Sequence, residues 1–140
     1  MEEFLDRRRP YFLSVLRIIA GLMLIPHGTA KFFGWPDTGR EGGVELFSLM
    51  GLAATIEIVG GLLLAIGLFT RSTAFIVSGF LAAAYYIAHA PRDLLPIVNE
   101  GELAALWCFV AFYIFIAGAG PWSVDAALEG GKRRSPVYTS

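Results

Sequence analysis

Residues 17–35 read RIIAGLMLIPHGTAKFFGW, and this stretch decides the fold of the chain. It is apolar enough to enter a bilayer, yet it carries Arg17, His27 and Lys31. An ionisable side chain near the centre of a membrane costs about 3 kcal/mol or more, so it usually faces protein or water. At about 100° per residue these three side chains share one face of a helix with Gly21 and Gly28. This polar face predicts neighbouring helices that satisfy it.

The composition of the whole chain is that of a membrane protein. Of its 140 residues, 56% are hydrophobic and 16% are charged, whereas a soluble domain carries about 25% charge. The net charge is −1, so the sequence predicts no nucleic acid partner. Cys108 is the single cysteine, which excludes a disulfide or a dithiol mechanism within one chain.

The apolar residues fall into four segments, and a hydrocarbon core of about 30 Å needs about 20 residues. The segments are 11–33, 46–70, 72–91 and 103–124. The turn between the second and third segments is so short that these two must be antiparallel. We therefore predict an all-α fold, an integral membrane four-helix bundle built from two antiparallel hairpins.

The basic residues predict the orientation of this bundle. With four spans, Arg7–Arg9, Arg71 and Lys132–Arg134 lie on one side, which the positive-inside rule makes cytoplasmic. Both the N and C termini are then cytoplasmic, in a multi-pass protein of the cell (inner, cytoplasmic) membrane. The first segment is not a cleaved signal peptide on this interpretation, because Arg17 interrupts it and three more apolar segments follow.

The domain organisation follows from the same segments. Residues 1–10 are expected to be a basic cytoplasmic N-terminus, 11–126 the membrane domain, and 127–140 a flexible basic C-terminal tail. Ser123 and Asp125 are suitable caps for a short amphipathic helix at the start of that tail.

Glu57 is the only charged residue of the second segment, and Arg17 lies on the polar face of the first. Each would otherwise be a lone charge in apolar surroundings, so we predict that Arg17 and Glu57 form a structural ion pair, directly or through water. If they do not pair, Glu57 is expected to reach Lys31 or His27 on the same helix face.

A group of polar residues is expected to converge near the two long loops and to line an outward-opening cavity. Candidate proton-handling groups are His27, Glu57 and His89, because histidine and carboxylate side chains can exchange protons. Candidate binding groups are Lys31, Tyr85, Asn99 and Glu102. No metal site is predicted, because two histidines on separate helices fall short of the usual three or four ligands.

Four motifs resemble those of the DoxX family of small four-helix membrane proteins, over about residues 12–126. The first segment resembles the family's opening pattern in Leu16-Arg17, Gly21, His27-Gly28 and Lys31-Phe32-Phe33-Gly34. The second resembles its E-x-x-G-G run in Glu57, Gly60, Gly61, Gly67-Leu68 and Thr70-Arg71. The fourth resembles N-x-G-E-x-A in Asn99, Gly101, Glu102 and Ala104, and G-x-G-x-W-S-x-D in Gly118, Gly120, Trp122, Ser123 and Asp125.

This resemblance implies a membrane subunit or anchor of a redox complex, because the family is named for a subunit of an archaeal thiosulfate:quinone oxidoreductase. Quinone is the cofactor it suggests, and a redox protein or further copies of the chain are the partners expected beside the lipid bilayer. Two alternatives stay open: an assembly scaffold without catalysis of its own, in which the polar groups pair with one another, and a small-solute or proton carrier with Glu57 as relay.

Overall fold

The computed structural model describes residues 1–39 and 41–133 and contains only helices and their connections within them. The helices are α1 (Glu2–Phe33), α2 (Leu49–Ile66), α3 (Thr70–Ala84), α4 (Glu102–Ala117) and α5 (Val124–Arg133). A π-helical turn, η1 (Tyr85–His89), continues α3 directly. The all-α prediction is confirmed.

Three of these elements are long and apolar enough to cross a membrane: α1, α2 and the continuous stretch Thr70–His89. The fourth apolar helix, α4, is shorter, with 16 residues. Its surface resembles that of the other three, since Phe109 is 71% exposed and Leu106 is 63% exposed. Large apolar side chains on the outside, with a small core, are typical of a protein whose solvent is lipid.

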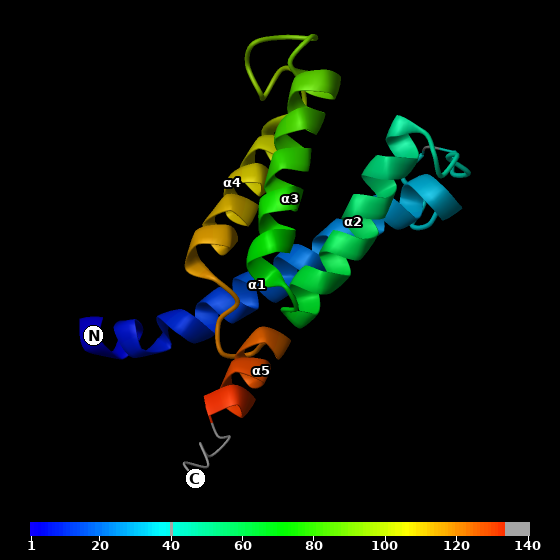
Figure 1. The fold of residues 1–140 in the computed structure, drawn as a ribbon. Coiled ribbons are helices and arrows are strands. Elements are labelled where there is room, and N and C mark those ends of the chain that lie inside the picture. Colours follow the sequence, from blue (N-terminus) through cyan, green and yellow to red (C-terminus); the bar gives the residue numbers. More distant parts are fainter. Residues whose placement is uncertain (40, 134–140) are drawn as a thin grey trace.

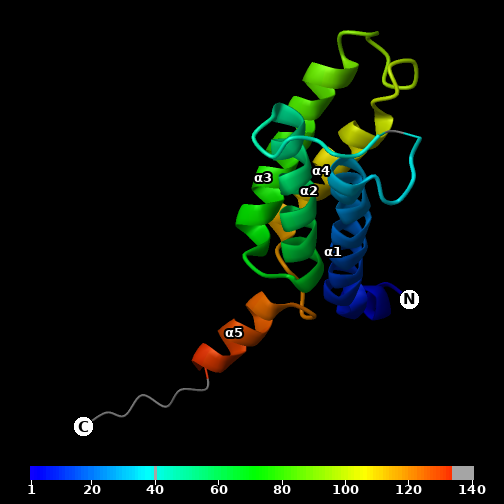
Figure 2. The ribbon, with the colours of Figure 1, turned by 90° about the vertical axis from the view of Figure 1, so that its right-hand side faces the viewer.

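The helices associate as two pairs. α1 packs along α2 and α3 packs along α4, with smaller contacts between α2 and α3 and between α1 and α4. Figure 1 shows the α1–α2 pair crossing the α3–α4 pair, and the two pairs diverge towards the end that carries the long loops. We call this the loop end (residues 34–48 and 90–101). The opposite end, with the α2–α3 connection and residues 118–125, is the turn end; α5 projects from it (Figure 2).

Glycines set the close packing of α1 against α2. A Cβ atom on Gly21 would lie 2.4 Å from the carbonyl oxygen of Gly61, and one on Gly28 would lie 2.5 Å from that of Ala54. Any larger residue at these positions would force the helices apart. The polar face of α1 is therefore also the face that meets α2.

The helix boundaries differ from the predicted ones for local reasons. α1 begins at Glu2 instead of residue 11, and ion pairs Glu3–Arg7 and Asp6–Arg9 stabilise its first turns. α2 begins later, at Leu49, because the hydroxyl of Ser48 accepts a hydrogen bond from the Gly51 N–H and caps the helix.

Glycines in the left-handed or other positive-φ region end two helices earlier than predicted. Gly67 has φ 72° and terminates α2, and Gly118 has φ 93° and terminates α4 seven residues before the predicted end at 124. α5 covers Val124–Arg133 and so includes the short amphipathic helix expected at the start of the predicted tail. The rest of that tail lies outside the described residues.

Candidate functional site

Arg17 is fully buried and contacts backbone carbonyl groups at the turn end instead of Glu57. Its Nε donates to the Ala119 oxygen at 2.8 Å, and Nη1 donates to the Ala65 oxygen at 2.8 Å. Further hydrogen bonds run to the carbonyl oxygens of Leu64 and Trp122. The guanidinium thus joins α1, the end of α2 and the segment that follows α4.

The predicted Arg17–Glu57 ion pair is therefore replaced by other contacts. The carbonyl groups of Leu64 and Ala65 belong to the last turn of α2, where they carry the negative end of the helix dipole; that of Leu64 also accepts from the Gly67 N–H of the cap. They attract a cation as a carboxylate would. Glu57 lies seven residues earlier on α2, about 10 Å along the helix axis at 1.5 Å per residue, towards the loop end.

Glu57 instead pairs with Lys31. The Lys31 Nζ lies 2.5 Å from both carboxylate oxygens. The Glu57 side chain is 8% exposed, whereas that of Lys31 is 24% exposed, so Lys31 is the more accessible member of the pair. Gly28 leaves room for the acid, since a Cβ there would lie 3.2 Å from the Glu57 Cβ. The pair bridges α1 and α2.

His27 precedes Lys31 by one helical turn and has an exposed side chain. An exposed histidine in a helix that can cross a membrane is unusual, because such groups generally face protein or a polar cavity. Its position brings a second titratable group onto the same part of α1 as the ion pair.

Tyr85, His89 and Asn99 form a separate network at the loop end. The Asn99 Nδ2 donates to the Tyr85 hydroxyl at 3.2 Å, and the His89 Nδ1 lies 2.9 Å from the Asn99 carbonyl oxygen. The Tyr85 and His89 rings stack with centroids 6.2 Å apart. Both aromatic residues belong to η1, and π-helical turns often occur at functional sites.

Asn99 holds the 90–101 loop closed. It is fully buried; its Nδ2 also donates to the Asp93 oxygen at 2.9 Å, and its Oδ1 accepts from the Gly101 N–H at 2.8 Å. A Cβ on Gly101 would lie 2.5 Å from Tyr85 Cε2, so only glycine lets the ring pack here. The Asn99–Gly101 part of the fourth motif therefore has a structural role.

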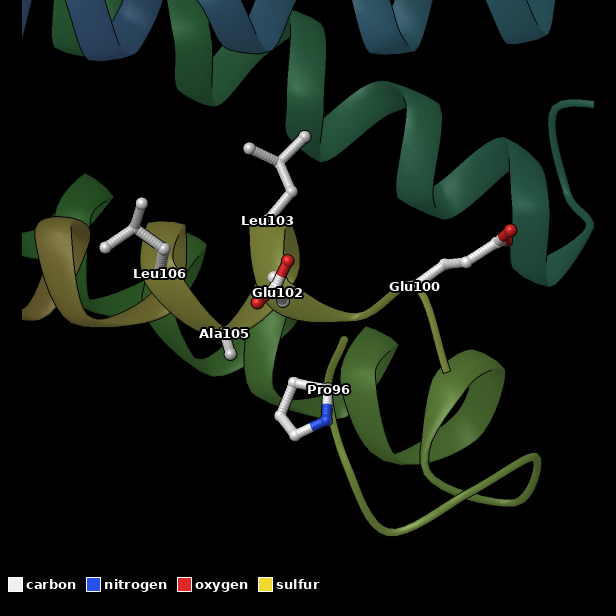
Figure 3. A pocket seen from close by; sticks show the side chains of 6 residues that line it. All are labelled: Pro96, Glu100, Glu102, Leu103, Ala105 and Leu106. Atoms are coloured by element: carbon white, nitrogen blue, oxygen red, sulfur yellow. The ribbon is translucent and has the colours of Figure 1, made fainter. Parts of the chain in front are cut away.

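Glu102 lies apart from both groups, on an open pocket of about 710 Å³ at the start of α4 (Figure 3). The pocket is lined by Pro96, Glu100, Glu102, Leu103, Ala105 and Leu106. In the described part of the chain, none of the other six predicted cavity residues lines this pocket. The structure brings Lys31 together with Glu57, and Tyr85 together with His89 and Asn99, on arms that diverge at the loop end (Figure 1).

Asp125 forms a clasp at the turn end that sequence reasoning missed. Its carboxylate accepts hydrogen bonds from the N–H groups of Phe69 at 2.9 Å and Thr70 at 2.8 Å, and so caps α3. Its own N–H donates to the Gly67 oxygen at 2.9 Å. Ser123 is the residue that caps α5, as predicted, through the Ala126 N–H at 3.1 Å. The W-S-x-D motif was the available signal, but it could not show that Asp125 reaches a different helix.

The charge of Asp125 is stabilised by this arrangement. Partial burial opposes ionisation, but the hydrogen bonds from Thr70 and Phe69, helped by the positive charge of Arg17, hold the pKa of Asp125 below its ordinary value of 3.8. The carboxylate thus remains an acceptor at neutral pH. Arg17 and Asp125 together fix the segment after α4 to the rest of the bundle.

These motifs and helices match a known family. The family model for DoxX matches residues 12–90, which is more than half of the chain. The chain belongs to the DoxX family. The matched region contains Arg17, Lys31 and Glu57, whereas the segment 118–125 lies beyond it.

Two relatives of this DoxX protein span almost the same length. One, from Haemophilus influenzae, is described as an "Uncharacterized protein" and is 45% identical over 126 residues, covering 86% of this chain and 93% of its own. The other, the "Putative oxidoreductase CatD" of Bacillus subtilis, is 26% identical over 130 residues, covering 88% and 91%. No solved structure matches the chain.

The ion pair and the loop-end network contain the polar side chains that the structure brings together in this half of the bundle. Across residues 1–39 and 41–133, no three histidine, cysteine, aspartate or glutamate side chains gather in a way that could hold a metal ion. The Lys31 ammonium can donate to a carbonyl oxygen, and the adjoining carboxylate and imidazole can exchange protons.

Proposed function

We propose that this DoxX protein is a membrane subunit of a quinone-linked redox complex. The observation that carries the proposal is the Lys31–Glu57 pair, a salt bridge inside the bundle whose lysine side chain remains partly exposed, one helical turn after the exposed His27. A charge pair retained among apolar helices is costly, and such groups commonly mark substrate or proton pathways. The name of the Bacillus subtilis relative, an oxidoreductase, supports the same class of function.

The proposed role of each group follows from its chemistry. A quinone headgroup offers two carbonyl oxygens, and the Lys31 ammonium donates a hydrogen bond to one of them. Reduction to quinol takes up two electrons and two protons. His27 and Glu57 hold and deliver protons, while the electrons come from a redox partner protein bound to the subunit. Tyr85, His89 and Glu102 contribute to the loop-end surface on which that partner or the ligand is bound, and the buried Asn99 holds the loop of this surface in place.

The membrane arrangement belongs to the same proposal. At 1.5 Å per residue, the 16 residues of α4 extend about 24 Å, somewhat less than the hydrocarbon core of about 30 Å. Because α4 packs along α3 and exposes large apolar side chains, we assign it as the fourth span. Both termini are then on the cytoplasmic side of the cytoplasmic membrane, and the loop end faces outward.

Ligand binding by the purified protein tests this function. A short-chain naphthoquinone should raise the melting temperature of the full chain in detergent in a dose-dependent way, because a ligand that binds only the native state stabilises it. His27→Ala should reduce that shift while leaving the melting temperature without ligand nearly unchanged, since its side chain is exposed. Arg92→Gln, which changes an exposed charge at the loop end, is the matched control.

A scaffold without catalysis is the second candidate, and the Arg17 contacts favour it. A guanidinium bound to four carbonyl groups, two at the end of α2 and two in the segment after α4, stabilises the bundle and has no donor atom left for chemistry. If the quinone produces no shift at any concentration, the Lys31–Glu57 pair is structural too and the scaffold becomes the better interpretation. A shift of equal size in wild type and His27→Ala would exclude His27 from the site.

A further inference from the structure

A second pocket lies at the turn end, away from the proposed quinone site. It has a volume of about 650 Å³ and lies between α5, the start of α3 and the segment after α4. Figure 1 shows α5 beneath the α2–α3 connection, and the Asp125 clasp holds it there. The polar and charged side chains on its wall include Arg71, Asp125 and Glu129, beside the apolar Phe69 and Leu128.

Arg71 presents a cation at this pocket. Its Nη1 donates to the carbonyl oxygens of Phe115 at 2.8 Å and Ile116 at 2.7 Å, at the end of α4. Among the described residues no hydrogen bond uses its Nε or Nη2. The side chain is exposed, so these donors are accessible to a ligand. A guanidinium with free donors is well suited to bind a phosphate group.

An apolar path leads from Arg71 along the outer surface of the α3–α4 pair. Phe75 lies one turn after Arg71 and its ring packs 5.3 Å from that of Phe115, which in turn packs 5.9 Å from Phe112. Phe75 is 59% exposed and Phe112 is 43% exposed. The pocket is thus continuous with the surface that faces the membrane, as a lipid with a polar head and apolar chains requires.

The balance of charge in the pocket selects the headgroup. Arg71 faces two carboxylates, those of Asp125 and Glu129, and the positive charge of the nearby Arg17 offsets that of Asp125. These four charges sum to zero, which suits a zwitterionic headgroup better than an anionic one. Asp125 is engaged with the α3 N-terminus, whereas Glu129 lies on an exposed turn of α5. Glu129 can accept hydrogen bonds from a primary ammonium, which a quaternary ammonium cannot donate.

We propose that this pocket binds the headgroup of a zwitterionic phospholipid with a primary amine, a phosphatidylethanolamine. Its phosphate lies against Arg71, its ammonium against Glu129, and its acyl chains follow the Phe75–Phe115–Phe112 surface. This proposal is independent of the quinone site, which lies in the α1–α2 pair.

Native mass spectrometry of the full chain in detergent tests the proposal with three lipids of matched acyl chains. We expect phosphatidylethanolamine to be retained about tenfold more than phosphatidylcholine or phosphatidylglycerol, the effect of one good charge-assisted hydrogen bond. Glu129→Gln should abolish this preference, and Arg71→Gln should weaken retention of all three lipids. Glu2→Gln removes the same charge from an exposed position at the N-terminal start of α1, and it should leave the retention of all three lipids unchanged.

Two further measurements keep the result unambiguous. Circular dichroism melting of Arg71→Gln shows whether this change also destabilises α4 by removing its C-terminal hydrogen bonds. If it does, the lipid preference is judged from Glu129→Gln alone. Soluble phosphoethanolamine should displace the bound lipid at millimolar concentration if the headgroup is recognised. Equal retention of the three lipids, or a preference that survives Glu129→Gln, would overturn the proposal.

Discussion

Lys31 neutralises Glu57 from the loop end of the bundle, with its Nζ 2.5 Å from both carboxylate oxygens. The carboxylate of α2 therefore pairs with a partly exposed side chain of α1, Lys31, instead of with the fully buried Arg17. This difference separates two roles that the sequence had combined. Arg17 stabilises the fold, while the Lys31–Glu57 pair has an accessible group with which to act.

The first prediction is that Lys31 and Glu57 are energetically coupled. Lys31→Met leaves a buried carboxylate without its partner and should cost about 3–5 kcal/mol of unfolding free energy. The double variant Lys31→Met/Glu57→Gln should recover part of this loss. Urea unfolding of the purified protein in mixed micelles measures the cycle, with Arg17→Gln/Glu57→Gln as the control. That control pair should be additive within about 0.5 kcal/mol.

The second prediction concerns Arg17. Arg17→Lys should destabilise the protein almost as much as Arg17→Gln, because an ammonium cannot reach carbonyl groups of two separate segments in the fork geometry of a guanidinium. The loss should exceed about 3 kcal/mol, since hydrogen bonds to a charged group contribute about 1.5–3 kcal/mol each. Hydrogen exchange should show that residues 118–125 lose protection first. Full stability in Arg17→Lys would contradict the role assigned to the guanidinium.

The sequence predicted the class of fold because hydropathy and turn length act locally. Four apolar segments and the short connection at Thr70 are enough to expect an all-helical membrane protein with antiparallel neighbours. Helix ends were predicted less well, because Gly67 and Gly118 act through positive φ angles that apolar periodicity does not reveal.

The partners of the charged residues depend on three-dimensional position, which the sequence pattern leaves open. Arg17 and Lys31 of the predicted polar face both have partners on neighbouring segments, whereas His27 is exposed. Which cation pairs with Glu57 depends on how far along the axis of α2 each one lies. The partners of Arg17 are backbone carbonyl groups at the end of α2, and every residue has such a group, so no residue type identifies them. The reach of Asp125 to the α3 N-terminus depends likewise on how α5 docks.

The third prediction is a loss of stability in acid through Asp125. Its pKa is lower in the folded protein than in the unfolded chain, so its contribution is fully present above the ordinary value of 3.8 and is lost as the pH falls through the folded pKa. The melting temperature of the wild type should therefore fall more between pH 5 and pH 3 than that of Asp125→Asn. Parallel pH profiles for the two proteins would show that the clasp does not contribute.

The fourth prediction concerns the loop-end network. Gly101→Ala places a Cβ atom 2.5 Å from Tyr85 Cε2 and 2.6 Å from Asn99 Oδ1, so either the ring or the loop must move. We expect faster amide exchange across residues 90–101 with little change in α1 and α2. Gly79→Ala is the matched control, because no atom lies within 4 Å of a Cβ at that position.

The fifth prediction is the orientation of the chain, which follows from four spans with cytoplasmic termini. In a Cys108→Ala background, a membrane-impermeant thiol reagent applied to intact cells should label Thr38→Cys and Ile97→Cys. Both positions lie in exposed segments of the loop end. Leu128→Cys on α5 is also exposed at 56%, so its side chain would react if it faced outward. We expect it to be labelled only after the membrane is opened.

Labelling of Leu128→Cys in intact cells, with Thr38→Cys protected, would reverse the orientation and place the phospholipid pocket in the outer leaflet. Labelling of Thr38→Cys without Ile97→Cys would instead remove either α2 or Thr70–His89 from the set of spans, because these two elements separate the loops and the loops then lie on opposite sides.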